Sequence, residues 1–212
     1  MGDQMNVSLR RTAFLTIAGL LLTIEPALAH HAMGGEMPST FGQGLLSGLA
    51  HPVIGLDHLA FLIAVGVAVG VGGLSLALPV AFVVASALGV VIHLFGFNLP
   101  GVELLVAASV VLIGALVASG RALPLAAWGA LFGLAGIFHG YAYGESIVGA
   151  EATPLWAYLL GLVVIQSALS VGVALITRRA GEGVSAIAPR LAGAVVVGVG
   201  LAALLGQLIP EA

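Results

Sequence analysis

The chain has 212 residues, of which 60% are hydrophobic and 7% are charged, and its formal net charge is −3. A soluble domain needs about a quarter of its residues charged, so this composition excludes a water-soluble globular protein and indicates a membrane protein. Lysine and cysteine are absent, which excludes a Walker-type phosphate loop, a disulfide framework and thiolate metal ligands.

Residues 1–29 are predicted to be a secretory signal peptide. Arg10 and Arg11 precede an apolar run at 13–24, and the sequence ALA at 27–29 forms a small-residue cleavage site. The apolar run is short for a membrane-spanning helix. An uncleaved signal anchor is the alternative.

Cleavage after residue 29 would leave residues 30–40 as a short extracytoplasmic tail. This tail begins with His30 and His31. The two histidines either collect a divalent metal outside the membrane or belong to a solvated terminus, and the sequence leaves both interpretations open.

The remainder, 41–212, is predicted to be a single all-α domain of six transmembrane helices. The apolar runs are continuous rather than alternating, which favours helices over a β-barrel. The first run contains Pro52 and Gly55 and is expected to be bent or interrupted. The predicted spans are 41–71, 74–97, 102–119, 123–143, 155–177 and 191–209, each near or above the ~20 residues that cross a bilayer.

The arginines predict the orientation of these spans. With the start of the mature chain outside, the connections 1–2, 3–4 and 5–6 face the cytoplasm, and both termini face the periplasm. The connection between spans 4 and 5 then faces outward and carries Glu145 and Glu151. All arginines after the signal peptide fall in or beside cytoplasmic connections, as the positive-inside rule expects: Arg121, Arg178, Arg179 and Arg190.

Ionisable side chains gather in the outer half of the predicted membrane domain. Such residues usually face a bundle interior and serve a pathway or a bound ion. Four spans contribute: His51, Asp57 and His58 from the first, His93 from the second, Glu103 from the third, and His139 and Glu145 from the fourth.

The first span places two of these histidines on one helical face. His51 and His58 are seven residues apart, within roughly 20° of each other, but a straight helix would separate them by about 10 Å. They can share one ion only if the helix bends near Pro52. Asp57 points roughly 120° away, so it either ligates through a distorted turn or orients a neighbouring histidine.

The fourth span has a similar arrangement. His139 and Tyr143 share a face, and the flanking glycines are expected to loosen the last turn so that Glu145 can return toward the site. His93 and Glu103 also have simpler interpretations, as a hydrogen-bonding group at a helix end and as a carboxylate favoured by a helix N-terminus. Imidazole and carboxylate together suit nickel, cobalt, zinc or copper better than magnesium or calcium.

Three segments resemble the HupE/UreJ family of membrane proteins associated with hydrogenase and urease systems. HPVIGLDHLAFLIAVG (51–66) is similar to its H-P-x-x-G-x-D-H signature, LPGVELLVAASVVLIGAL (99–116) to its P-x-x-E segment, and HGYAYGES (139–146) to its H-G-x-A-x-G-x-E segment. One departure is Tyr143, where a histidine would be expected. The resemblance implies a nickel or cobalt permease whose polar motif positions are His51, Asp57, His58, Glu103, His139 and Glu145.

The resulting prediction is a multi-pass permease of the bacterial inner membrane that takes up nickel or cobalt, and not an enzyme. No tightly bound cofactor and no nucleic-acid partner are expected; the partners are the transported ion and the lipid bilayer, and a homo-oligomer remains open. An intramembrane metalloenzyme and a haem protein with two histidine ligands are the alternatives. The sequence leaves open the choice of metal, the pathway served and the source of energy.

Overall fold

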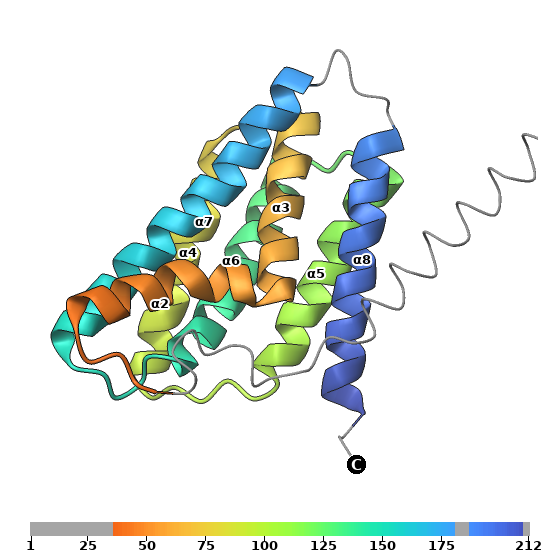
Figure 1. Ribbon diagram of the computed structural model, residues 1–212. Helices are drawn as coiled ribbons and strands as arrows, with labels where there is room; N and C mark the ends of the chain where they lie inside the picture. The colour runs from red at the N-terminus through yellow and green to blue at the C-terminus, as the bar shows by residue number, and fades with distance from the viewer. Residues whose placement is uncertain (1–35, 181–186, 210–212) are drawn as a thin grey trace, which may run out of the picture.

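A computed structural model describes residues 36–180 and 187–209. The predicted signal peptide, with His30 and His31, lies outside the described residues. Within the described part, all regular structure is helical, as predicted, and seven helices follow one another (Figure 1). They are α2 (Phe41–Ile54), α3 (Leu56–Val71), α4 (Ala77–Leu94), α5 (Val102–Ser119), α6 (Leu125–Glu145), α7 (Ala152–Ala180) and α8 (Ile187–Leu208).

The helices agree with the predicted spans. Five of them, α4 to α8, are each long and apolar enough to cross a membrane, and α2 with α3 makes a sixth if the bent pair is counted as one span. The chain is therefore a multi-pass membrane protein. Helix α7 is longer than its predicted span; its 29 residues would extend about 43 Å at 1.5 Å per residue, which exceeds the ~30 Å hydrocarbon core and requires tilt.

The predicted interruption of the first span lies at Gly55. The helix runs through His51 and Pro52, ends at Ile54, and resumes at Leu56 with its axis turned by 76°. Gly55 has an extended backbone (φ −70°, ψ 101°) and serves as the boundary of both helices. The break therefore comes after the proline, which sits in the last turn of α2.

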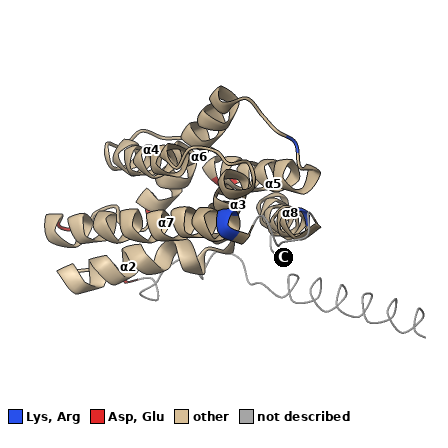
Figure 2. Cartoon of the chain, turned by 90° about the horizontal axis from the view of Figure 1, so that it is seen from above, with Lys and Arg blue, Asp and Glu red and all other residues tan. Residues whose placement is uncertain are grey.

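Helix α3 occupies the middle of the bundle, and the other helices surround it (Figures 1 and 2). Its side chains Phe61, Leu62, Val65 and Val69 are fully buried. Around it the helices pack as pairs, α2 with α7, α4 with α6 and α5 with α8. Small residues lie at the interfaces of these pairs and allow the two backbones to approach closely. Such close packing holds helices together in a membrane, because the hydrophobic effect does not favour helix–helix contact over helix–lipid contact.

One such approach fixes the position of α2. A Cβ on Gly48 would overlap the carbonyl oxygen of Tyr158 in α7. Any larger residue at this position would push α2 away from α7. Because His51 follows Gly48 by less than one turn, the same contact positions the histidine.

The four arginines among the described residues gather at one end of the bundle, as the orientation argument expects (Figure 2). Figure 2 looks onto this end, where α3, α5 and α7 finish and α4, α6 and α8 begin. There Arg178 donates a hydrogen bond to the Leu74 carbonyl and ties the end of α7 to the turn between α3 and α4. Which end faces the cytoplasm stays a prediction.

Candidate functional site

Three histidines from three helices meet in the half of the bundle away from the arginines. His51 comes from α2, His58 from the first turn of α3, and His139 from α6. Each is at most 3% exposed. The ring centroids of His51 and His58 are 5.8 Å apart, and those of His58 and His139 are 5.0 Å apart. We call these three residues the histidine cluster.

The bend at Gly55 makes this meeting possible. A straight helix would hold the two histidines of the first span about 10 Å apart along its axis, whereas the turn of 76° brings their rings into contact range. The predicted bend is therefore present and brings the two rings together, while the sharing of one ion by His51 and His58 stays a prediction.

Hydrogen bonds fix the tautomer of His139. The Ser109 hydroxyl donates its single proton to the Val106 carbonyl at 2.7 Å, so the 2.9 Å contact with His139 Nε2 must be a bond donated by the imidazole. Neutral His139 then carries its lone pair on Nδ1. That nitrogen lies 2.8 Å from His58 Nδ1, which therefore donates the proton they share.

Tyr158 orients His51 in the same way. Its hydroxyl donates to the Tyr143 carbonyl at 2.8 Å and so accepts from His51 Nδ1 at 3.1 Å. The Ser146 hydroxyl lies 3.0 Å from the same nitrogen. The lone pair of neutral His51 is thereby placed on Nε2, which is the arrangement that supports a metal-binding imidazole through its other ring nitrogen.

Tyr143 stands beside the cluster at the position where the family resemblance calls for histidine. It is fully buried, and its ring lies 4.4 Å from His58 and 5.1 Å from His51. Its hydroxyl is buried without a hydrogen-bond partner among the described residues. A phenol therefore occupies space next to the cluster that a further imidazole would fill.

The carboxylates take different places. Asp57 accepts a hydrogen bond from the main-chain N–H of His58 at 2.8 Å, in the first turn of α3. Glu103 lies in the first turn of α5. Glu145 ends α6 and is exposed.

The expectation that glycines loosen the end of α6 was wrong. The helix stays regular through Glu145, and both glycines in its last turns are needed for close packing. A Cβ on Gly140 would overlap the Ser86 carbonyl, and one on Gly144 would lie 2.7 Å from His93 Cβ. These contacts hold the turn in place, so Glu145 does not return to the histidine cluster.

His93 lies apart from the cluster, near the end of α4. Its ring packs on Tyr141 with centroids 4.4 Å apart. Tyr141 also donates to the Phe97 carbonyl and accepts from the Leu99 N–H, which fastens the segment between α4 and α5. The location at a helix end agrees with the simpler interpretation of His93, but the expected hydrogen bonding is not seen at Nδ1, which is buried without a partner among the described residues.

The six motif residues are therefore only partly assembled. Three histidines converge, but across the described residues no three His, Asp or Glu side chains form a group that could hold one ion in this arrangement. Sequence reasoning missed Tyr158, because nothing distinguishes a tyrosine within an apolar span. It also missed the role of Ser109, although that serine lies in the 99–116 segment.

The model for the HupE / UreJ protein family matches residues 18–203. Protein HupE of Rhizobium leguminosarum bv. viciae is 36% identical to the chain over 194 residues, which covers 90% of this chain and 96% of the relative. No solved structure matches the chain.

Proposed function

The chain belongs to the HupE/UreJ family, and on that premise we propose that it carries nickel or cobalt inward across the bacterial inner membrane. The observation behind this proposal is the histidine cluster. Three nearly inaccessible imidazoles from three helices are costly in a membrane interior unless they serve a ligand or a pathway.

The spacing of the cluster suits a six-coordinate divalent ion. Two nitrogens bound at about 2.0–2.1 Å in neighbouring octahedral positions lie about 2.9 Å apart. The Nδ1 atoms of His58 and His139 are 2.8 Å apart. An ion binding to both would require the His58 proton to leave Nδ1, either for Nε2 of the same ring or for water. The remaining positions would be filled by water or by oxygen ligands.

The broken first span also supports transport. Transporters commonly place ion sites where a helix is interrupted in the membrane, with the carbonyl end of a half-helix toward the cation. Here the C-terminal end of α2 meets the start of α3 at the histidine cluster. Asp57, in the first turn of α3, supplies negative charge near the same break.

A haem held between His58 and His139 is not supported by this arrangement. A haem iron takes its two axial nitrogens from opposite faces of the porphyrin. The Nδ1 atoms of His58 and His139 are 2.8 Å apart and joined by a hydrogen bond, which leaves no space for a macrocycle between them. We propose no catalytic role, since within residues 36–180 and 187–209 no nucleophile or acid–base pair separate from the cluster stands out.

The energy for uptake would come from the membrane potential or a coupled gradient. A divalent cation moving inward gains about 4.6 kcal/mol per 100 mV, from about 2.3 per charge. The chain has no lysine and so no Walker-type lysine for ATP.

Uptake of radioactive nickel and cobalt by cells expressing the chain tests the proposal. His58→Ala should abolish uptake, because it removes an imidazole without adding a buried charge. Asp57→Asn keeps the volume and removes the charge, so it should impair uptake severely. His93→Ala is the matched control and should have a milder effect, because His93 packs on Tyr141 outside the cluster.

All variants must be compared at equal amounts of inserted protein. Normal uptake by both His58→Ala and Asp57→Asn would contradict the proposal. So would variants that fail only because the protein is lost from the membrane, since the cluster would then be structural.

A further inference from the structure

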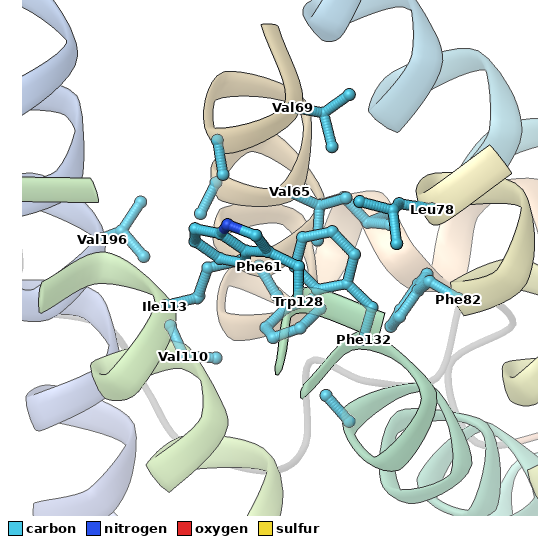
Figure 3. Packing of buried hydrophobic residues seen from close by; sticks show 14 of the residues in the cluster. Phe61, Val65, Val69, Leu78, Phe82, Val110, Ile113, Trp128, Phe132 and Val196 are labelled. Carbon is cyan, nitrogen blue, oxygen red and sulfur yellow. The ribbon is translucent and has the colours of Figure 1, made fainter. Parts of the chain in front are cut away.

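The direct way inward from the histidine cluster is closed by an apolar core. Phe61 packs on His139 with ring centroids 4.4 Å apart, and Phe82 lies 5.9 Å from the same imidazole. Beyond them come Phe132 and Trp128, whose rings are 5.5 Å apart (Figure 3). An ion entering this core would lose every ligand, which is prohibitive for a divalent charge.

Polar groups continue inward along a different surface, the face of α7 that packs on α3. Tyr158 at the cluster is followed on this face by Gln166 and Ser170, which are both almost completely buried. Gln166 and Ser170 are four residues apart and so lie on one face, one turn from each other, and Tyr158 precedes Gln166 by eight residues, about two turns. Thr177 extends the polar series toward the arginine end.

The contacts between α3 and α7 give the level of each group. A Cβ on Gly66 would lie 2.8 Å from the Ser170 carbonyl, and one on Gly70 would lie 2.7 Å from the Ala174 carbonyl. In both pairs the residue of α7 follows its partner by 104 positions, and the hydrogen bond from Arg178 to the Leu74 carbonyl joins residues with the same separation. By this register Gln166 lies beside Leu62, one turn or about 6 Å inward of His58.

Two buried neutral oxygens lack partners, one at this level and one on α4 beside His139. Gln166 Oε1 is buried and has no hydrogen-bond partner among the described residues, and the same holds for the Ser86 hydroxyl on α4. Gln166 is 1% exposed and Ser86 is 0% exposed. Ser86 packs on Gly136 and Gly140, the small residues on either side of His139. Leaving such groups unpaired in an apolar interior costs free energy, which a cation or its bound water would recover.

We propose that Gln166 Oε1 is a second coordination position for the divalent ion, reached after it leaves the histidine cluster and passes the level of Ser86. This inference rests on the proposed function. A carboxamide oxygen binds nickel or cobalt less tightly than imidazole. Conduction needs sites that are weak enough to release the ion, so a neutral oxygen one turn inward favours onward movement. Ser170, whose hydroxyl donates to the Gln166 carbonyl at 2.6 Å, keeps oxygen lone pairs available one turn further along α7.

Gln166→Met tests this position, because methionine keeps the length of the side chain and removes the carboxamide. Radioactive nickel and cobalt uptake should fall by roughly tenfold, the loss expected for one interaction with a charged group. Thermal stability in detergent should be equal to or above that of the parent chain, since a buried amide oxygen without a partner is removed. The affinity of purified protein for nickel should stay unchanged, because the histidine cluster is intact.

Gln207→Met is the matched control, since Gln207 is exposed near the end of α8, and it should transport normally. Parental uptake by Gln166→Met would overturn the second position. A parallel loss of nickel affinity and uptake would also overturn it, because Gln166 would then belong to the capture site. If the parent chain itself takes up neither metal, the proposed function fails first, and this inference fails with it.

Discussion

Replacing Gly140 by alanine should force α4 and α6 apart. A Cβ at this position would overlap the Ser86 carbonyl oxygen and lie 2.6 Å from the carbonyl carbon of the same residue. Contacts of Cβ atoms below 3.0 Å are essentially never found, and the obstacle is backbone, which cannot rotate away. The two helices must therefore separate, and His139, the neighbour of Gly140, moves with α6.

The expected destabilisation follows from these contacts. Overpacking by one carbon in a well-packed interior costs about 1–3 kcal/mol. Alanine recovers up to ~1 kcal/mol of this through its better helix propensity. Gly133→Ala provides the control on the same helix, because a Cβ there would meet no atom within 4 Å, and it should leave stability unchanged or raise it. Because the propensity gain is common to both variants, they should differ by the overpacking cost alone, about 1–3 kcal/mol.

Thermal unfolding of purified protein in detergent measures this difference, with the amount of inserted protein as a second readout. Gly140→Ala should unfold at a lower temperature than Gly133→Ala. It should also take up less metal per inserted molecule, since the bond between His58 and His139 depends on the position of α6. Equal unfolding temperatures for the two variants would refute the close packing of α4 on α6.

Three further predictions concern orientation, a loop and the support of the cluster. In intact cells, Val148→Cys should react with an impermeant maleimide and Ser75→Cys should not, against a background without native cysteine; the reverse pattern would invert the topology. Tyr141→Phe removes both hydrogen bonds to the segment between α4 and α5 and should lower stability by about 1–2 kcal/mol; an unchanged unfolding temperature would contradict this. Tyr158→Phe removes a hydrogen-bond acceptor of a cluster histidine and should reduce uptake about tenfold at unchanged protein level; normal uptake would show that this support is dispensable.

The membrane spans and their approximate positions could be predicted from the sequence alone, apart from the extra length of α7. Partition into lipid depends on the summed hydrophobicity of about 20 neighbouring residues and on backbone hydrogen bonds within one helix, so it is a local property. The same holds for the gathering of arginines at one end, which follows once the spans are counted. The shared level of His58 and His139 also follows from chain position, because each lies a fixed number of residues from a helix end.

Other features depended on contacts between helices. The sequence placed a break near Pro52 and Gly55, but its angle of 76°, and with it the approach of His51 to His58, comes from packing α2 on α7 at Gly48. Lipid and the protein interior are similarly apolar, so the hydrophobic effect does not select which face of a helix points inward. The rotation of each helix about its axis and its choice of partner helix are therefore decided by the fit of small residues against the backbone of distant helices.

The same reason explains the composition of the site. Local spacing suggested that Glu145 would return to the cluster, but Gly140 and Gly144 pack against α4 and keep the helix regular. Tyr158 carried no local signal, yet it supports His51 from 107 residues away in the chain. The types of the polar residues and their depth in the membrane could be predicted from the sequence. Which of these polar groups contact one another is decided by the three-dimensional packing of all the helices.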